Sequence, residues 1–100
     1  MKSGYKIYWT AEALSNLRNV LKYLDENWSE KEIKNFVRKL DNRLNLIALN
    51  PKLFSKTKAK KNVRKSVLTR HTVIYYSFEN EMVNILTLFD PRQNPSKLKL

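Results

Sequence analysis

The side chains that could carry chemistry in this 100-residue chain are mostly cationic, and many of them lie in one stretch. Between Asp41 and Glu79 the sequence has no carboxylate, and the formal net charge of the chain is +11. The basic residues of that stretch are Arg43, Lys52, Lys56, Lys58, Lys60, Lys61, Arg64, Lys65 and Arg70. Such a field attracts polyanions and speeds association with them. We interpret the stretch as a surface for nucleic acid or for an acidic protein, and the alternative is a solvated loop that aids solubility.

Arg64 is the first candidate for a functional residue. A guanidinium can face a phosphate with two parallel N–H groups, a geometry that lysine cannot supply. The structural alternative is an ion pair with a carboxylate such as Asp90 across a sheet, which would hold the fold. Both interpretations remain open. The further candidates for contacts with nucleic acid or another target are Lys56, Lys58, Lys60, Lys61, Lys65, Arg70 and His71.

Tyr75 and Tyr76 are neighbours in a run with strand character, so their side chains point to opposite faces. One of them should therefore lie in the core. The other could stack on a base or donate a proton, or it could simply be a surface aromatic beside a basic groove. His71 falls at a hairpin corner, where a histidine is more often solvated than catalytic.

Several kinds of site are excluded by composition. The chain has one histidine and no cysteine, so no metal cluster of ordinary His and Cys spacing can be assembled. The single glycine, Gly4, rules out a glycine-rich phosphate loop. No close pair of acids is evident in the strand region for general acid–base work. We expect no cofactor and no metal, and any catalysis would depend on Arg, Lys, Tyr and His71.

The length and composition predict one domain, residues 1–100, large enough to bury a core without metals or disulfides. The content of hydrophobic residues, 42%, agrees with a globular fold rather than disorder. The absence of cysteine fits a reducing compartment. We see no signal-peptide core at the amino terminus and no apolar run as long as a membrane helix needs. These observations together predict a soluble cytoplasmic protein without a membrane contact.

Helical periodicity predicts two amphipathic helices in the first half of the chain. Thr10 is a candidate N-cap for a helix over residues 11–27, which has apolar residues at spacings of three and four. Ser29-Glu30-Lys31-Glu32 has the form of a capping box and should start a second helix. Asn50-Pro51 should end it, because proline disfavours a helical residue before it. Two such helices joined by a tight corner predict an antiparallel hairpin.

Strand-like runs occupy residues 5–9, 63–68, 72–78 and 82–89. The last three are separated by connectors too short for a crossover, which predicts an antiparallel meander. Residues 53–62 should be the least regular part of the chain, with Leu53 and Phe54 anchored to the core and an exposed, mobile segment at residues 56–61. Residues 96–100 should form a basic tail. The expected fold is α+β, with order β-α-α-β-β-β and the helix hairpin packed on one face of a small, mostly antiparallel sheet. The sequence does not place the first strand. We look for function on the other face of the sheet and on the basic segment.

These elements carry a family resemblance that covers nearly the whole chain. The quoted segments are TAEALSNLRNVLKYL, LNLIALNP and VRKSVLTRHTVIYYSFENEMVNILTLFDPRQNP. In order, the pattern places Leu46 and Ile47 before Pro51, Arg64 at the start of a strand, Ile74–Tyr76, an acidic turn at 79–81, Ile85–Leu86 and Arg92. The chain thereby resembles the RelE/ParE superfamily of bacterial type II toxin–antitoxin toxins. The resemblance implies a toxin that is silenced by a cognate antitoxin and inhibits growth when free.

Members of the superfamily differ in their target, and each target implies a different function for this chain. RelE-like members are ribosome-dependent mRNA endoribonucleases with a basic cluster, usually with a Tyr or His. By that resemblance Arg64, Tyr76 and Arg92 are the candidate catalytic residues, with Arg92 expected to join Arg64 at one end of the sheet. ParE-like members are associated with DNA gyrase. Many ribonuclease members have a His after the last strand, whereas this chain has Asp90-Pro91-Arg92 there. We therefore favour a ParE-like or divergent toxin, and whether the chain is an enzyme stays open.

Two other functions are compatible with the sequence. One is a non-enzymatic nucleic-acid-binding module that uses lysines 56–61 as a phosphate-binding arm. The other is a degenerate toxin that keeps only its binding to the antitoxin. The expected partner in a heteromeric toxin–antitoxin complex is an acidic, amphipathic antitoxin segment, which could wrap the helix hairpin or add to a sheet edge and so cover the basic face.

Overall fold

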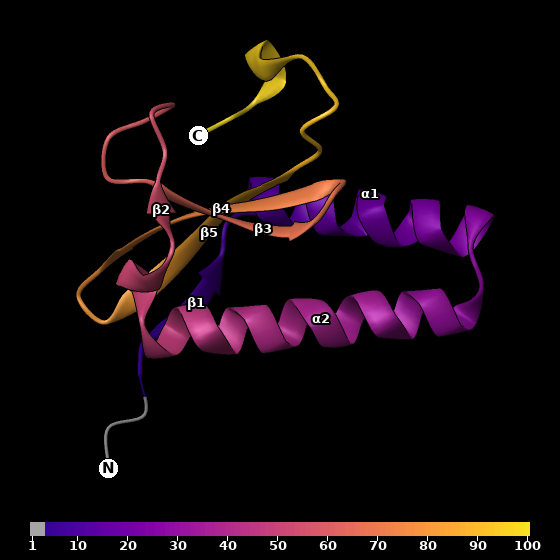
Figure 1. Ribbon diagram of the computed structural model, residues 1–100, viewed down its shortest axis with the longest axis horizontal. Coiled ribbons are helices and arrows are strands. Elements are labelled where there is room, and N and C mark those ends of the chain that lie inside the picture. Colours follow the sequence, from indigo (N-terminus) through magenta and orange to yellow (C-terminus); the bar gives the residue numbers. More distant parts are fainter. Residues whose placement is uncertain (1–3) are drawn as a thin grey trace.

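The computed structural model describes residues 4–100 and has the predicted α+β fold, with two helices on a five-stranded sheet (Figure 1). Its strand order is β1-β5-β4-β3-β2. Two short 3₁₀ turns, η1 and η2, follow α2 and β5. The elements are β1 (Lys6–Trp9), α1 (Ala11–Asn27), α2 (Glu30–Leu49), η1 (Pro51–Leu53), β2 (Ser55–Lys56), β3 (Arg64–Thr69), β4 (Thr72–Glu79), β5 (Met82–Phe89) and η2 (Pro95–Lys97).

The two helices begin and end where their capping residues indicate. The Thr10 hydroxyl accepts a hydrogen bond from the backbone N–H of Ala13, and the Ser29 hydroxyl accepts one from that of Glu32. These bonds satisfy N–H groups that the first turn leaves without helical partners. α2 ends at Leu49, and Pro51 follows directly after the cap residue Asn50. Figure 1 shows the helices as an antiparallel hairpin that extends past the strands on one side.

Strands β3, β4 and β5 form the predicted antiparallel meander, and β1 completes it as a parallel strand beside β5. The hairpin of helices is the crossover that lets β1 and β5 run in the same direction. Beyond the end of β1, polar side chains of the first helix cap the outer edge of β5. The Thr10 hydroxyl donates to the Ile85 carbonyl at 2.8 Å, and the Asn16 side-chain oxygen accepts from the backbone N–H of Leu88 at 3.0 Å.

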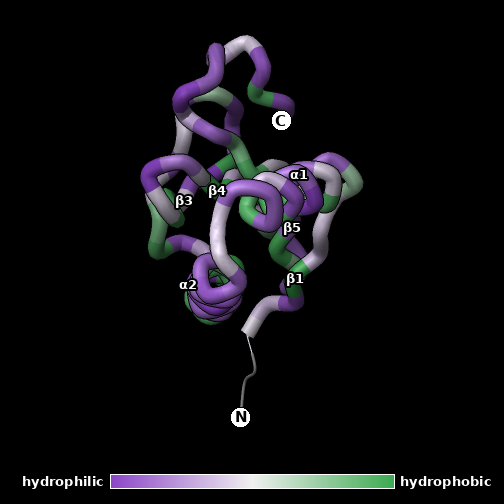
Figure 2. The backbone as a smooth tube through the Cα atoms, turned by 90° about the vertical axis from the view of Figure 1, so that its right-hand side faces the viewer, coloured by the Kyte–Doolittle hydropathy of each residue, from purple (hydrophilic) through white to green (hydrophobic). Residues whose placement is uncertain are grey.

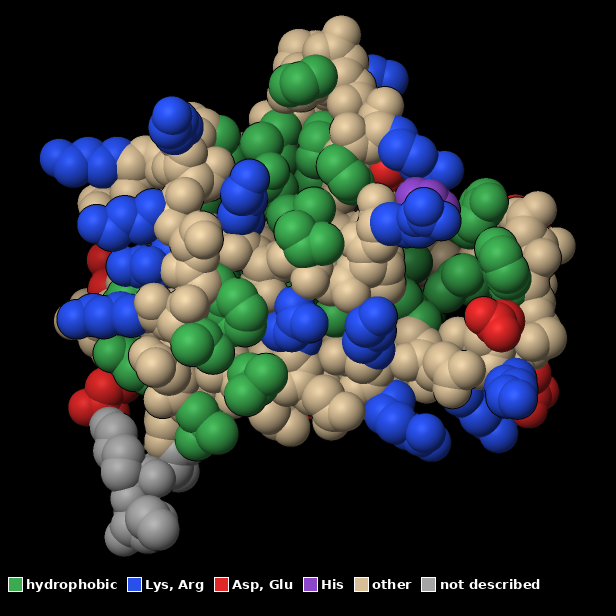
Figure 3. Space-filling model, in the orientation of Figure 1, with side chains coloured by type: hydrophobic (Ala, Val, Ile, Leu, Met, Phe, Trp, Pro, Cys, Tyr) green, Lys and Arg blue, Asp and Glu red, His purple; other side chains and the backbone are tan. Residues whose placement is uncertain are grey.

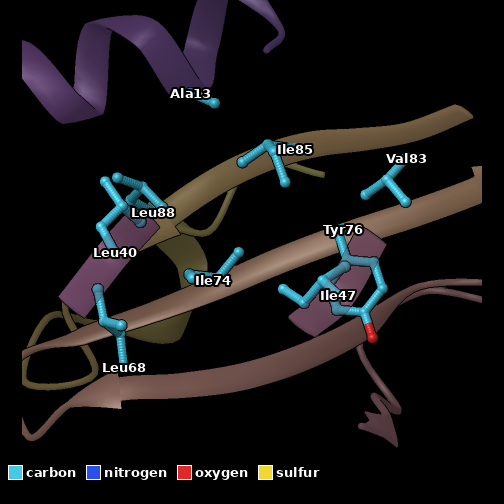
Figure 4. Packing of buried hydrophobic residues seen from close by; sticks show 9 residues of the cluster. All are labelled: Ala13, Leu40, Ile47, Leu68, Ile74, Tyr76, Val83, Ile85 and Leu88. Atoms are coloured by element: carbon cyan, nitrogen blue, oxygen red, sulfur yellow. The ribbon is translucent and has the colours of Figure 1, made fainter. Parts of the chain in front are cut away.

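The main core lies between the sheet and the helix hairpin. Figure 4 shows side chains of α1 and α2 meeting those of the strands, with Ile47 of α2 beside Tyr76 of β4. The buried hydrophobic residues of this cluster are Ala13, Leu40, Ile47, Leu68, Ile74, Tyr76, Val83, Ile85 and Leu88. Figure 2 looks along α2, whose tube is mainly hydrophilic, whereas stretches of the strands are hydrophobic. The helices therefore depend on the sheet to bury their narrow apolar stripes.

The other face of the sheet differs from the expectation of an open functional surface. A second buried cluster, formed by Val63, Val73, Tyr75 and Phe89, lies there, and Leu98 and Leu100 of the tail pack against it. The segment expected to be the least regular part of the chain contains β2, which pairs with the start of β3. The second cluster forms because apolar side chains far apart in sequence cover one another, whereas β2 is held by backbone pairing of two exposed residues with β3. Among the described residues, no helix is long and apolar enough to cross a membrane.

Gly4 lies directly before β1 at φ +92°, in the left-handed region that favours glycine. A Cβ at this position would lie 2.9 Å from the carbonyl oxygen of Ala48, which itself accepts the N–H of Tyr5. We therefore expect Gly4→Ala to lower the free energy of unfolding by about 1–3 kcal/mol. Urea denaturation followed by circular dichroism measures this change. Lys6→Ala, at an exposed position of the same segment, is the control, and equal stability of both variants would contradict the prediction.

Candidate functional site

The structure separates the residues that the sequence suggested would act together. Arg64 begins β3 and faces Tyr76 across the ladder, whereas Arg92 follows β5, whose last residue faces Val73. β3 runs from Arg64 to Thr69, and Arg92 lies near the Thr69 end of the sheet, so the two arginines are separated by the full length of β3. The expectation that Arg92 joins Arg64 at one end of the sheet is wrong. Antiparallel neighbours put the start of one strand beside the end of the next, so strand order decides which termini meet.

The guanidinium of Arg64 is bound to the backbone of the segment between α2 and β2. Its Nη1 donates to the carbonyl of Phe54 at 2.7 Å and to that of Lys52 at 3.4 Å. The guanidinium carbon also lies 5.8 Å from the ring centroid of Phe78. The suggested ion pair with Asp90 is wrong, because Asp90 binds Arg92 instead. Arg64 therefore holds η1 and β2 against the sheet, with one face of its side chain toward solvent.

The side chain of Tyr76 is fully buried at the inner face of the sheet. Its hydroxyl donates to the carbonyl of Pro51 at 2.6 Å. Burial raises the pKa of Tyr76 to about 12, although the nearby charge of Arg64 acts in the opposite direction. Tyr75 is buried on the opposite face and packs edge-on against Phe89, with ring centroids 6.5 Å apart. Tyr76 is therefore the tyrosine that was expected to lie in the core. Tyr75 is buried as well, so neither of the two is a surface aromatic.

Arg92 and Asp90 form an ion pair just beyond β5. Nη2 of Arg92 lies 2.6 Å from Oδ2 of Asp90, and Nε lies 3.0 Å from Oδ1, so the contact is bidentate. The Asp90 carboxylate also accepts the backbone N–H of Arg92. This hydrogen bonding from the Arg92 side chain holds the pKa of Asp90 below its usual value. Arg92 thus stabilises the turn after β5 through its ion pair with Asp90.

The Asp90–Arg92 pair predicts a pH dependence. Since the pKa of Asp90 is lowered in the folded state, its contribution to stability is complete above the unfolded pKa and disappears as the pH falls through the folded pKa. Asp90→Asn should therefore lose less stability than the wild type between about pH 5 and about pH 3. Thermal unfolding at a series of pH values tests this. Asp25→Asn, at an exposed position on α1, is the comparison. If the wild type and Asp90→Asn lose the same stability as the pH falls, the prediction is refuted.

A groove of about 930 Å³ lies where the projecting helices, the Thr69–Thr72 corner and the tail meet. Its apolar wall includes Val20, Leu24, Phe36 and Phe89. The charged and polar residues that line it include Tyr23, Lys39, His71, Arg92, Lys97 and Lys99, together with the acids Glu12, Glu32 and Asp90. Figure 3 shows hydrophobic side chains on the projecting helices, close to the single histidine. We refer to it as the hairpin groove.

The hairpin groove was not predicted from the sequence, although the lengths of the elements contain a signal for it. Residues of the helix stripes and the corner between the helices remain exposed, with Tyr23 at 54% and Trp28 at 52%. α2 has 20 residues and the longest strand has 8. At about 1.5 Å per helical residue and about 3.3 Å per strand residue, the helix is somewhat longer than the strands. An apolar stripe that outruns its sheet is left without cover at its far end.

The predicted binding residues remain exposed, and they do not form one group. Lys56, Lys58, Lys60 and Lys61 lie in β2 and the loop after it, and Lys65 lies on β3. Lys60 donates to the carbonyl of Leu100 at 2.7 Å, so it contributes to holding the tail. Arg70 and His71 form the exposed corner between β3 and β4, at the other end of β3. Residues 4–100 contain no cluster of three or more His, Asp or Glu side chains placed to hold a metal.

Comparison with protein families identifies the chain. The family described as the ParE toxin of the type II toxin–antitoxin system parDE matches residues 7–95. The chain belongs to this family. It is thus a ParE-like toxin of the RelE/ParE superfamily, as the resemblance implied. No curated protein matches this ParE-family chain.

A solved structure supports the fold of this ParE-family member independently of sequence. A chain described as the chromosomal ParDE TA system from P. aeruginosa superposes with a TM-score of 0.74. The match covers 89% of this chain and 98% of that chain, at 12% sequence identity. At such low identity the likeness concerns the arrangement of helices and strands. It agrees with the helix hairpin and open sheet described above.

Proposed function

We propose that this ParE-family toxin inhibits growth, when free of its antitoxin, by acting on DNA gyrase rather than by cleaving mRNA. One observation carries the choice between the two targets: the residues suggested for RNA cleavage are separated from one another or engaged with the fold. Tyr76 is buried against Pro51, Arg64 is bonded to Phe54, and Arg92 is paired with Asp90 at the other end of the sheet.

Cleavage of RNA by a general acid–base route needs groups that can reach the ribose hydroxyl and the phosphate together. A candidate base must come within hydrogen-bond distance of the proton that it removes. The Tyr76 hydroxyl has no exposed surface, and its raised pKa keeps it protonated at neutral pH. His71 lies in the corner at the far end of β3 from Arg64. This arrangement favours a toxin that works by binding a protein target in the cytoplasm.

We further propose that the hairpin groove receives the antitoxin. An apolar wall with basic residues at the rim suits an amphipathic acidic segment that becomes ordered on binding. Lys39, Arg92, Lys97 and Lys99 supply positive charge to the groove, and its acids Glu12, Glu32 and Asp90 offset part of it. This seat corresponds to the first of the two expected modes, in which the antitoxin contacts the helix hairpin. In this mode the antitoxin does not need to add a strand to the edge of the sheet.

Controlled expression tests the proposed target. The toxin is induced with and without co-expression of its cognate antitoxin, and cells are scored for growth, for transcript integrity and for induction of the DNA-damage response. We expect growth arrest with intact messages and a DNA-damage response, and rescue by the antitoxin. The purified toxin should also inhibit supercoiling by purified gyrase. Cut transcripts without DNA damage would instead support the ribonuclease function.

Two tyrosines of equal exposure test the proposed antitoxin seat. Tyr23 lines the hairpin groove and is 54% exposed, whereas Tyr8 is 53% exposed on β1 and does not line it. Tyr23→Glu should weaken binding of the antitoxin by at least about tenfold, because it puts a negative charge where an acidic segment binds. Tyr8→Glu should leave the affinity unchanged. Isothermal titration calorimetry measures both, and equal effects of the two substitutions would argue against the groove.

A further inference from the structure

A surface formed by the C-terminal end of α2, η1 and β3 combines exposed leucines with lysines and an arginine. We define it by the apolar residues Leu46, Leu49, Leu53 and Val67 and the basic residues Arg43, Lys52 and Lys65, and call it the basic apolar face. Figure 3 shows hydrophobic side chains lying among Lys and Arg side chains on the side of the molecule that carries α2 and β2. No Asp or Glu occurs between residues 41 and 79, so the sequence segments that supply this face have no carboxylate to neutralise it.

Hydrogen bonds join the three segments that build the basic apolar face. Arg43 of α2 donates from Nη1 to the Ser66 hydroxyl and to the Val67 carbonyl, both at 2.7 Å. Its guanidinium carbon lies 5.4 Å from the ring centroid of Phe54. Arg64 then binds the carbonyls of Lys52 and Phe54. The C-terminal end of α2, the η1 segment and β3 are thereby held as one preformed surface.

The apolar residues of this face are more exposed than packing of the fold requires. Val67 is 59% exposed, Leu49 is 67% exposed and Leu53 is 55% exposed. Leu46 and Leu49 are three residues apart on α2, so they lie on neighbouring parts of its outer surface. Single exposed apolar residues are ordinary, but a group of them surrounded by charge marks a binding surface. None of these residues lines the hairpin groove.

We infer that the basic apolar face binds an acidic segment of the toxin's target protein, one that also presents apolar side chains. This inference rests on the proposed function, in which the toxin acts by binding a protein. The chemistry selects the partner: lysines and arginines attract carboxylates, and the leucines gain by burial against apolar side chains. A phosphate backbone would leave the leucines unmatched. A second copy of the chain would bring another surface of the same charge.

The antitoxin is the less suitable occupant of this face. The hairpin groove lies at the Thr69 end of β3 and shares no residue with the basic apolar face. The groove offers a partner apolar contacts on several sides, whereas an open, charged face suits rapid encounter with a large target.

Two double substitutions test the inference in the full chain. The variant Leu49→Ser with Leu53→Ser removes apolar contacts at exposed positions, and the variant Lys52→Glu with Lys65→Glu reverses charge. The matched controls lie outside the face: Tyr8→Ser for the first, and Lys22→Glu with Lys31→Glu for the second. Circular dichroism and thermal unfolding establish that each variant is folded. Growth arrest, binding to purified gyrase, binding to the antitoxin and binding to a duplex DNA oligonucleotide are then measured.

We expect both face variants to weaken binding to gyrase by at least about tenfold, equivalent to about 1.4 kcal/mol, and to relieve growth arrest. The affinity of the face variants for the antitoxin should stay within about twofold of the wild-type value. The two control variants should keep the wild-type affinity for gyrase and for the antitoxin within the same limit. The serine variant decides the class of partner, because it removes no charge. If it still arrests growth while the charge-reversed variant does not, and growth arrest follows affinity for DNA, the protein-segment inference is overturned.

Other results also overturn the inference, and they differ from those that overturn the proposed function. If both face variants still arrest growth, or if they lose only their affinity for the antitoxin, the face is not the surface that binds the target. If the wild-type toxin arrests growth without binding gyrase, the proposed target is wrong, and the face is then judged by growth arrest in its variants. If the wild-type chain does not arrest growth at all, both proposals fail.

Discussion

Tyr76→Ala should lower the free energy of unfolding by about 3–5 kcal/mol, the range for large-to-small changes of buried aromatic residues. The ring of Tyr76 lies in the centre of the main core, beside Ile47 of α2 (Figure 4). Its removal leaves a cavity between the sheet and the helix and also removes the donor to the Pro51 carbonyl. Chemical denaturation measures the loss. We expect the variant to be depleted in cells, so its weak toxicity alone would not identify a catalytic residue.

Tyr76→Phe separates the structural role of this residue from a catalytic one. The phenylalanine keeps the ring and removes only the hydroxyl, which leaves the Pro51 carbonyl without its donor and should cost about 1–2 kcal/mol. A protein that remains folded should stay fully toxic if the hydroxyl does no chemistry. A folded Tyr76→Phe protein without toxicity would restore the ribonuclease mechanism, because proton transfer by the hydroxyl would then be required.

Alkaline pH offers a second test of the same hydroxyl. The pKa of Tyr76 is raised to about 12 in the folded state, so its stabilising effect is complete below the unfolded value near 10. It is lost as the pH rises through the folded value. The wild type should therefore lose more stability than Tyr76→Phe between about pH 10 and about pH 12. Identical losses in the two proteins would contradict the burial of this group.

Arg64→Ala should lower the free energy of unfolding by about 1.5–3 kcal/mol. Its guanidinium is the donor for the carbonyls of Phe54 and Lys52, and it also packs over the ring of Phe78. Without it, η1 and β2 keep their backbone and Tyr76 contacts but lose one attachment to β3, and a partly buried carbonyl loses a charge-assisted bond. Lys65→Ala, which removes an exposed charge from the next position of the same strand, should change stability by less than about 0.5 kcal/mol.

Growth assays with Arg64 variants complete this comparison. If Arg64 acts only by supporting the basic apolar face, the loss of growth arrest in Arg64→Ala should be accounted for by its losses of stability and of target binding. Arg64→Lys should recover little, because one ammonium cannot replace a planar guanidinium at two carbonyls and an aromatic ring. A fully stable Arg64→Ala protein that has lost toxicity would mean that the arginine meets a phosphate or a target group directly. That result would favour the functional interpretation considered from the sequence.

The elements that the sequence predicted well depend on contacts between near neighbours. Thr10 and Ser29 cap helices whose N–H groups lie two or three residues away, and Pro51 ends α2 by its own covalent geometry. The short connectors of the meander left antiparallel pairing as the only choice for β3, β4 and β5. These local signals sufficed for the fold class, and the ordered set of elements sufficed for the superfamily.

Only the tertiary structure decided where those elements meet and which charged groups remain free. β1 pairs with β5, Arg92 binds Asp90, Arg64 binds the turn after α2, and Tyr76 is sealed in the core, so the predicted site residues are dispersed. The same packing left the projecting helices open as a groove. The physical reason is that a side chain's partners across a sheet are chosen by strand order and by competition for burial, and neither quantity is encoded in the spacing of residues along the chain.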